Sequence, residues 1–189
     1  LLAHAGIKGF STQKLVWGSS VPDQPTTPYG ENGQGIPFNV GRWIGPDGSS
    51  VVAALNPGDY GGRVTADLST AAALDNRPSG RNAERQPYPA QSFLARLTED
   101  RQNLGIMADY HYYGTGDVGG SPTDSSVMWI ERSVQDKSGP IKVVSARADQ
   151  FFRDLTPAEI AKLPSYSGEM ELQNHSAGSL TSQAYQKRW

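Results

Sequence analysis

Apolar side chains recur along this chain at two spacings, one typical of helices and one typical of strands. In residues 88–104 the spacing is helical and Gly105 follows, as at many helix C-termini; the apolar positions are Phe93, Leu94, Leu97 and Leu104. Similar patterns predict helices near residues 66–74, 124–134 and 146–155. Thr156 and Glu159 form a capping-box pattern, which predicts one more helix start.

Short apolar runs between these helices predict strands, at residues 7–12, 50–55, 106–113 and 141–145. Asp47 and Gly48 are a turn signal, which joins residues 42–44 to the strand at 50–55 as a hairpin. Strands that alternate with helices are typical of parallel sheets. The predicted fold class is therefore α/β with a parallel sheet.

The composition describes a loop-rich chain. Its 189 residues include 21 Gly and 13 Pro, with 37% hydrophobic residues and a mean hydropathy of −0.52. Irregular segments that carry function are therefore expected. A formal charge of −2 and a pI near 5.9 provide no basic field for phosphate backbones, so nucleic acid is not an expected partner.

Targeting and redox signals add little. No apolar run approaches the roughly 18 residues of a membrane span, and no signal peptide is visible, although a leader upstream of Leu1 could have been lost. The absence of cysteine excludes disulfides, thiolate metal sites and cysteine nucleophiles, but it does not fix the compartment.

A polar run that ends in a tryptophan follows the first predicted strand, Thr12-Gln-Lys14-Leu-Val-Trp17. Strand ends are the usual place for substrate contacts in parallel α/β folds. An amine or amide can donate to sugar hydroxyls, and an indole face can pack on the C–H face of a pyranose. The alternative is a solvated Lys14 and a core Trp17.

A glycine-rich run follows the predicted strand at 106–113, Gly114-Thr-Gly116-Asp-Val-Gly119. It matches the dinucleotide fingerprint G-x-G-x-x-G, but Pro122 delays the next helix and so keeps its N-terminus away from a pyrophosphate. The preceding strand is also too polar for a central Rossmann strand. We therefore reject nucleotide binding. Locally, Asp117 is explained as a turn aspartate that bonds its own loop.

Three further runs complete a family resemblance, namely residues 36–52 with Trp43, residues 114–123 with Asp117, and residues 168–188 with His175. Together with residues 6–17, they resemble glycoside hydrolase family 38, the metal-dependent α-mannosidases. The last run departs from the family pattern at two points. Ser176 stands where an Arg is usual, and one extra residue precedes Thr181.

The resemblance implies a portion of a (β/α) barrel-like catalytic domain in residues 1–180, with residues 181–189 opening a helical region. It implies α-mannoside hydrolysis with retention, Asp117 as general acid/base, and sugar contacts from Lys14, Trp17, Trp43 and His175. Asp109, Asp124 and Glu169 are weaker candidates for the acid. Locally, Trp43 is also explained as an interior aromatic, Asp47 as a turn residue, and His175 as a structural donor.

Zinc is implied for a complete family enzyme, but no metal is expected for this chain alone. The histidines, at positions 4, 111 and 175, are far apart in the sequence. In the family, the metal-binding His-x-Asp pair, the nucleophile and a further His fall outside the matching region. We therefore expect residues 1–189 alone to be inactive, with the rest of the polypeptide or an oligomer partner completing the site.

Two alternatives to the enzyme remain open. The chain could be a noncatalytic carbohydrate-binding module that holds glycans through Trp17, Trp43 and the tyrosines at 110–113. It could also be an inactive protease-resistant remnant. The linkage preference and the oligomeric state do not follow from the sequence.

Overall fold

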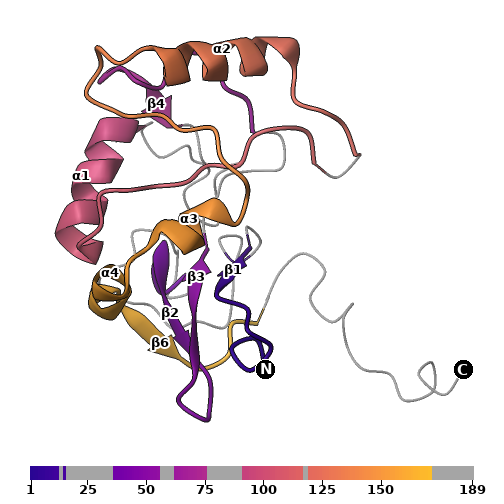
Figure 1. The fold of residues 1–189 in the computed structure, drawn as a ribbon, viewed down its shortest axis with the longest axis vertical. Coiled ribbons are helices and arrows are strands. Elements are labelled where there is room, and N and C mark those ends of the chain that lie inside the picture. Colours follow the sequence, from indigo (N-terminus) through magenta and orange to yellow (C-terminus); the bar gives the residue numbers. More distant parts are fainter. Residues whose placement is uncertain (13–14, 16–35, 56–61, 76–90, 117–118, 172–189) are drawn as a thin grey trace, which may run out of the picture.

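The structure is a computed structural model that describes residues 1–12, 15, 36–55, 62–75, 91–116 and 119–171. A four-stranded sheet lies at one end, and two longer helices lie toward the other (Figure 1). The strands of this sheet are β1 (Gly9–Ser11), β2 (Val40–Ile44), β3 (Ser50–Ala54) and β6 (Ser165–Ser167). A separate two-stranded ribbon pairs β4 (Leu74–Asp75) with β5 (Gln91–Ser92).

The main sheet is mixed, with strand order β1-β3-β2-β6. β1 runs parallel to β3 and β6 runs parallel to β2, but β2 and β3 are antiparallel. The short turn after Ile44 makes β2 and β3 antiparallel, because strands joined by a tight turn must run in opposite directions. Gly48 in that turn has φ 79°, a left-handed conformation that suits glycine. The predicted hairpin is confirmed, whereas the wholly parallel sheet is wrong.

β3 is buried on both faces of the sheet. Val52 and Ala54 pack with residues of the helical side, in a cluster that includes Leu104, Ile106 and Phe152. Ala53 and Leu55 pack on the opposite face, in a cluster with Leu15, Ile36 and Phe38. The alternation follows from the two-residue period of a strand.

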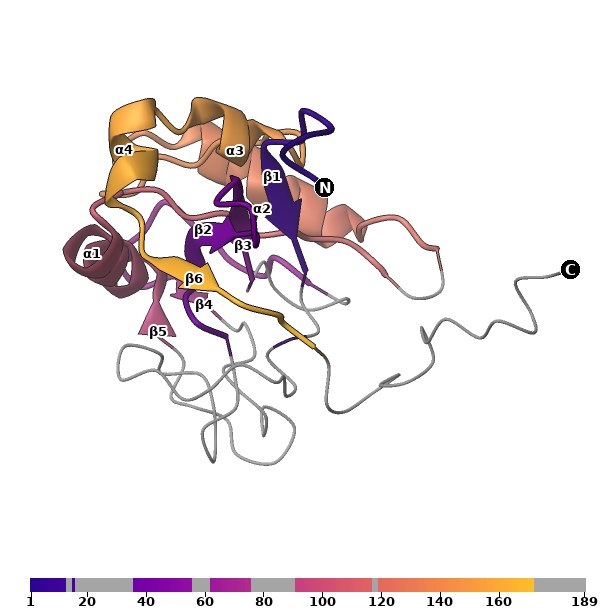
Figure 2. The same ribbon diagram turned by 90° about the horizontal axis from the view of Figure 1, so that it is seen from below.

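Four helices are assigned in the described part of the chain, α1 (Phe93–Leu104), α2 (Asp124–Gln135), α3 (Gln150–Asp154) and α4 (Pro157–Lys162). α3 and α4 cover one side of the sheet, and both views agree on this (Figures 1 and 2). A side chain at Gly9 of β1 would place its Cβ 2.3 Å from the Phe152 ring, so this glycine lets α3 approach the sheet closely.

The helix ends match the sequence signals. Ser92 caps α1, and Gly105 ends it in the left-handed conformation. Thr123 caps α2, with its side chain accepting from the N–H of Ser126. Thr156 and Glu159 form the predicted capping box of α4. These predictions are confirmed because the signals depend only on neighbours in the sequence.

Three predicted elements are wrong. Residues 66–73 form turns and bends rather than a helix, and Leu74 begins β4. The carboxylate of Asp67 accepts from the backbone N–H and the hydroxyl of Ser69, a local bond that competes with helix formation. Residues 106–113 and 141–145 contain no strand residues. In the first of these segments, the N–H of Tyr110 donates to the side chain of Asp109 rather than to a neighbouring strand.

The (β/α) barrel implied by the resemblance is not seen in the described residues, where the sheet is open and mixed. In the same part of the chain, the helices are too short and too polar to cross a bilayer.

Candidate functional site

Most of the predicted site residues lie outside the described residues. This applies to Lys14, Trp17, Asp117 and His175. The expected convergence of Lys14, Trp17 and Asp117 on one pocket therefore stays a prediction. Trp43 is described, and so are the residues that flank Asp117 on both sides, at 116 and 119.

Trp43 lies in β2 and packs between strands. Its ring centroid is 5.5 Å from that of Phe10 in β1, and its indole N–H donates to the carbonyl of Gly168 at 2.8 Å. The side chain is half-buried. Its indole N–H already has a hydrogen-bond acceptor, the backbone carbonyl just after β6. These contacts fit the interior aromatic that the local sequence indicates, and sugar binding by Trp43 stays a prediction.

The segment that carries Asp117 has a tightly closed base. We call residues 114–120 the acid loop. Thr115 and Gly120 form an isolated antiparallel bridge, and the Thr115 hydroxyl donates to the carbonyl of Ser121 at 2.9 Å. A Cβ at Gly120 would lie 3.0 Å from the Thr115 side chain, so a larger residue at 120 would crowd the bridge. In the sequence, Asp117 lies between these two bridged residues.

A second contact ties the acid loop to the rest of the molecule. The N–H of Gly114 donates to the carbonyl of Gly62 at 2.9 Å. Gly114 has φ 137° and Gly119 has φ 69°, conformations that L side chains rarely adopt. Backbone geometry therefore favours glycine at positions 114 and 119.

The helix after the acid loop starts too late for a dinucleotide site. α2 begins at Asp124, beyond Pro122, and the Thr123 side chain already occupies the N–H of Ser126 in its first turn. A phosphate at the acid loop would not meet this helix N-terminus. The structure agrees with our rejection of the nucleotide fingerprint.

Upstream of the acid loop lies a buried ion pair that the sequence did not reveal. Nε of Arg96 in α1 lies 2.9 Å from Oδ2 of Asp109, with side-chain exposures of 6% and 10%. Oδ1 of the same carboxylate accepts from the N–H of Tyr110 at 2.8 Å. A guanidinium beside a carboxylate stabilises its ionised form. Asp109 is therefore poorly suited to donate a proton.

The other weaker acid candidates are exposed. Asp124 occupies the first turn of α2, where the helix dipole favours a negative charge, and Glu169 lies just after β6. Asp117 lies outside the described residues, so its role as the acid stays a prediction.

An aromatic cluster packs behind the segment that leads into the acid loop. Tyr110 stacks on Phe151 of α3 at 4.9 Å, and Tyr112 meets Tyr110 edge-on at 5.5 Å. The Tyr110 hydroxyl lies 3.4 Å from Oγ of Ser11, at the carboxyl end of β1. The segment after α1 is thus placed beside the strand that leads toward Lys14 in the sequence.

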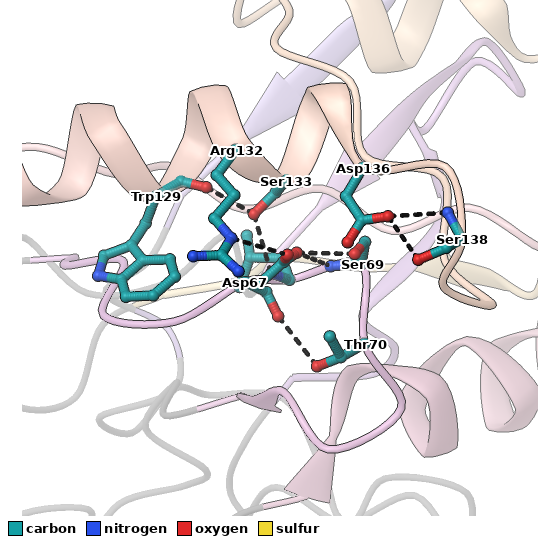
Figure 3. A network of polar contacts seen from close by, with 9 residues as sticks. Asp67, Ser69, Thr70, Trp129, Arg132, Ser133, Asp136 and Ser138 are labelled. Atoms are coloured by element: carbon teal, nitrogen blue, oxygen red, sulfur yellow. Dashed lines mark hydrogen bonds and ion pairs between the residues drawn. The ribbon is translucent and has the colours of Figure 1, made fainter.

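A polar network holds residues 67–70 against α2 (Figure 3). Oγ of Ser133 accepts from the N–H of Leu68 at 2.9 Å, and Asp67 binds the backbone and hydroxyl of Ser69. Ser133 and Ser69 are fully buried. No sequence pattern indicates the bond from Leu68 to Ser133, because these two residues are far apart in the chain.

The carboxylates of Asp47 and Asp136 each accept hydrogen bonds from a serine two residues later in a turn. Hydrogen bonds from Ser49 and His4 keep the pKa of Asp47 far below its usual range, and the carboxylate closes the β2–β3 turn. Bonds from Ser138 likewise lower the pKa of Asp136, just after α2. The turn interpretation of Asp47 is confirmed.

Within the described ranges, no three or more His, Asp or Glu residues are grouped so that they could hold a metal ion. Whether the complete site uses zinc is not tested by this arrangement.

Two curated proteins are similar to the chain over nearly all of its length. α-Mannosidase G of Dictyostelium discoideum is 29% identical over 191 positions, which cover 100% of this chain and 14% of that protein. An α-mannosidase of Saccharomyces cerevisiae is 28% identical over 191 positions, which cover 97% of this chain and 14% of that protein. No protein-family model matches the chain.

The chain therefore spans about 14% of the length of the curated relatives it matches. Both relatives are named as α-mannosidases, which confirms the resemblance that the sequence motifs indicate.

Proposed function

We propose that this chain is part of the catalytic domain of a retaining α-mannosidase of the family 38 type, acting on mannose-containing glycans. The observation that carries the proposal is the similarity to two α-mannosidases, one of which matches 100% of the chain and so includes the acid loop. The described sheet would belong to a larger (β/α) barrel-like domain, and residues 181–189 would begin the helical region after it.

Asp117 is the proposed general acid/base. Retaining glycoside hydrolysis needs one carboxylate as nucleophile and a second, about 5–5.5 Å away, that protonates the leaving oxygen and then activates water. The bridge between Thr115 and Gly120 joins the two described ends of the segment that carries Asp117 in the sequence. A fixed base suits a proton donor, which must reach the glycosidic oxygen within hydrogen-bond distance.

The proposed sugar contacts are Lys14, Trp17, Trp43 and His175. Lys14 and His175 would bind hydroxyls, and Trp17 would pack on a pyranose face. Thr12 lies directly after β1 and donates its N–H to the carbonyl of Ala54, which fixes the backbone from which this segment continues.

Zinc is proposed only for the complete enzyme. The described histidines and carboxylates do not form a group that fits a metal, so its ligands and the nucleophile would come from other parts of the enzyme. When bound, zinc would polarise the sugar hydroxyls or ring oxygens that it contacts. No step at Asp117 depends on it here.

The test is the dependence of rate on the leaving group in the complete enzyme. Asp117→Asn should slow the hydrolysis of mannosides with poor leaving groups by about 10²–10⁴-fold, because these need proton donation. Activated aryl mannosides should be affected far less in their first step. kcat/KM for both substrate types is the measurement.

Asp124→Asn is the matched control, because it removes an exposed carboxylate a few residues away on the first turn of α2. It should leave both rates nearly unchanged. Equal losses on both substrates in Asp117→Asn would indicate a structural role, and unchanged rates would remove Asp117 from the mechanism.

A further inference from the structure

We propose that Arg96 is a positioning residue for proton transfer, acting through its ion pair with Asp109 on the segment that leads into the acid loop. The inference rests on the proposed function of Asp117. It adds that this function depends on Arg96, which lies outside the acid loop. Arg96 is in the second turn of α1, and Asp109 lies upstream of the loop in the same chain segment.

The pair is buried and direct. Nε of Arg96 lies 2.9 Å from Oδ2 of Asp109, and the two side chains are 6% and 10% exposed. A guanidinium stays charged in proteins, so removing it from water is costly unless a carboxylate faces it. Arg96 is therefore committed to a negatively charged partner, and its place on a capped helix fixes where that partner must lie.

The carboxylate transmits this constraint to the backbone. Oδ2 faces Arg96, while Oδ1 accepts from the N–H of Tyr110 at 2.8 Å. With both oxygens contacted, the Asp109 side chain fixes the orientation of the peptide between residues 109 and 110. The Tyr110 ring then stacks on Phe151 of α3 at 4.9 Å. The segment is thus held between α1 and α3.

The anchored segment is short. Four residues beyond Tyr110, Gly114 bonds Gly62, and Thr115 forms the bridge that closes the acid loop. In the proposed role, the orientation that Asp109 gives to the backbone at Tyr110 is carried along these few residues to the base of the loop. Displacement of about 1 Å at a reacting group can cost about 10²-fold in rate.

Stability alone is a weak explanation for this pair. Apolar residues of similar size often stabilise a fold as well as a buried ion pair does, so the pair is better explained by the geometry it enforces. A purely structural role predicts equal rate losses on all substrates. A positioning role for the proton donor predicts a loss that depends on the leaving group.

The experiment uses the complete enzyme with Arg96→Met and Asp109→Asn. Asp109→Asn keeps an oxygen that can accept from Tyr110 but removes the charge that faces Arg96. For both variants, kcat/KM for a poor-leaving-group mannoside should fall at least about tenfold, within the range that general acid catalysis supplies. kcat/KM for an activated aryl mannoside reports only the first step, whose leaving group needs no proton, and should change by less than about threefold.

Arg101→Met is the matched control, because Arg101 lies on the same helix with an exposed side chain. It should leave both rates unchanged. If Arg96→Met does not fold, as circular dichroism would show, Asp109→Asn carries the test.

Two results overturn the inference. The first is equal loss on both substrates in folded Asp109→Asn. The second is unchanged activity in that variant while Asp117→Asn shows the selective loss, which would leave the proposed function intact. If Asp117→Asn itself lacks the selective loss, the proposed function fails, and this inference fails with it.

Discussion

Thr115 is the residue before Gly116 and Asp117, and its hydroxyl makes the contact that closes the acid loop. It donates to the carbonyl of Ser121 at 2.9 Å, while its backbone forms the bridge with Gly120. The side chain is exposed, so its burial contributes little to the fold. Its main effect should be on the geometry of the loop.

Thr115→Val keeps the shape of the side chain and removes the hydroxyl. In the complete enzyme, we expect kcat for poor-leaving-group mannosides to fall by about tenfold, because the proton donor is less well held. The free energy of unfolding should change by about 1 kcal/mol or less, the net value of one hydrogen bond. Steady-state kinetics and urea unfolding measure the two effects.

Thr98→Val is the control for this change. Thr98 is also exposed and donates to a backbone carbonyl, that of Leu94 at 2.8 Å, but it lies within α1. If both threonine variants reduce activity alike, the effect belongs to lost hydrogen bonds in general, and Thr115 has no special role.

At the scale of elements, α2 is held by serines that point inward. Ser126 accepts from the N–H of Val64 at 3.1 Å, and Ser133 accepts from the N–H of Leu68 at 2.9 Å. Both serines are buried, whereas Val127, Met128 and Val134 on the same helix are exposed. Hydrogen bonds to the 64–70 segment therefore fix this face of α2.

Ser133→Ala tests that account. The variant leaves the N–H of Leu68 without its acceptor, and a buried donor that loses its partner costs about 1–3 kcal/mol. The decrease in the free energy of unfolding can be measured with urea. Ser125→Ala, at an exposed position in the same helix, should change it by less than about 0.5 kcal/mol. Equal effects in the two variants would contradict the inward role of Ser133.

The elements that could be predicted from sequence are those with local causes. The Asp47-Gly48 turn, the Thr156 capping box and the Gly105 helix end each involve neighbours in the chain. The helix predicted at 66–74 and the strand predicted at 106–113 are wrong, although the apolar spacing favours them. Hydrogen bonds to the side chains of Asp67 and Asp109 hold the backbone in other conformations. The Arg96–Asp109 pair and the bond from Leu68 to Ser133 join distant residues, which no single-sequence pattern reveals.

The candidate site was predictable to a similar degree. The glycine spacing at 114–119 indicated a special loop, and its positive φ values show why glycine is needed at 114 and 119. The contacts of Trp43 with Phe10 and Gly168 could not be foreseen, since they depend on the order of the strands.

At the scale of the whole molecule, the chain covers only 14% of each matched relative, so its chemistry is proposed as part of a longer enzyme. The described parts include an open mixed sheet and a glycine-rich segment in which Thr115 and Gly120 bridge each other. In this account the chain supplies the acid/base, and other parts of the enzyme supply the nucleophile and metal. The central claim is the role of Asp117.

The most direct measurement is rescue of Asp117→Ala by azide in the complete enzyme, with an activated aryl α-mannoside as substrate. Without the base, water attacks the glycosyl-enzyme slowly, but azide needs no deprotonation and can enter from the same face. We predict faster turnover with azide and an α-mannosyl azide product, identified by nuclear magnetic resonance. A β-mannosyl azide would instead identify Asp117 as the nucleophile, and no rescue of a folded, slow variant would contradict the acid/base role.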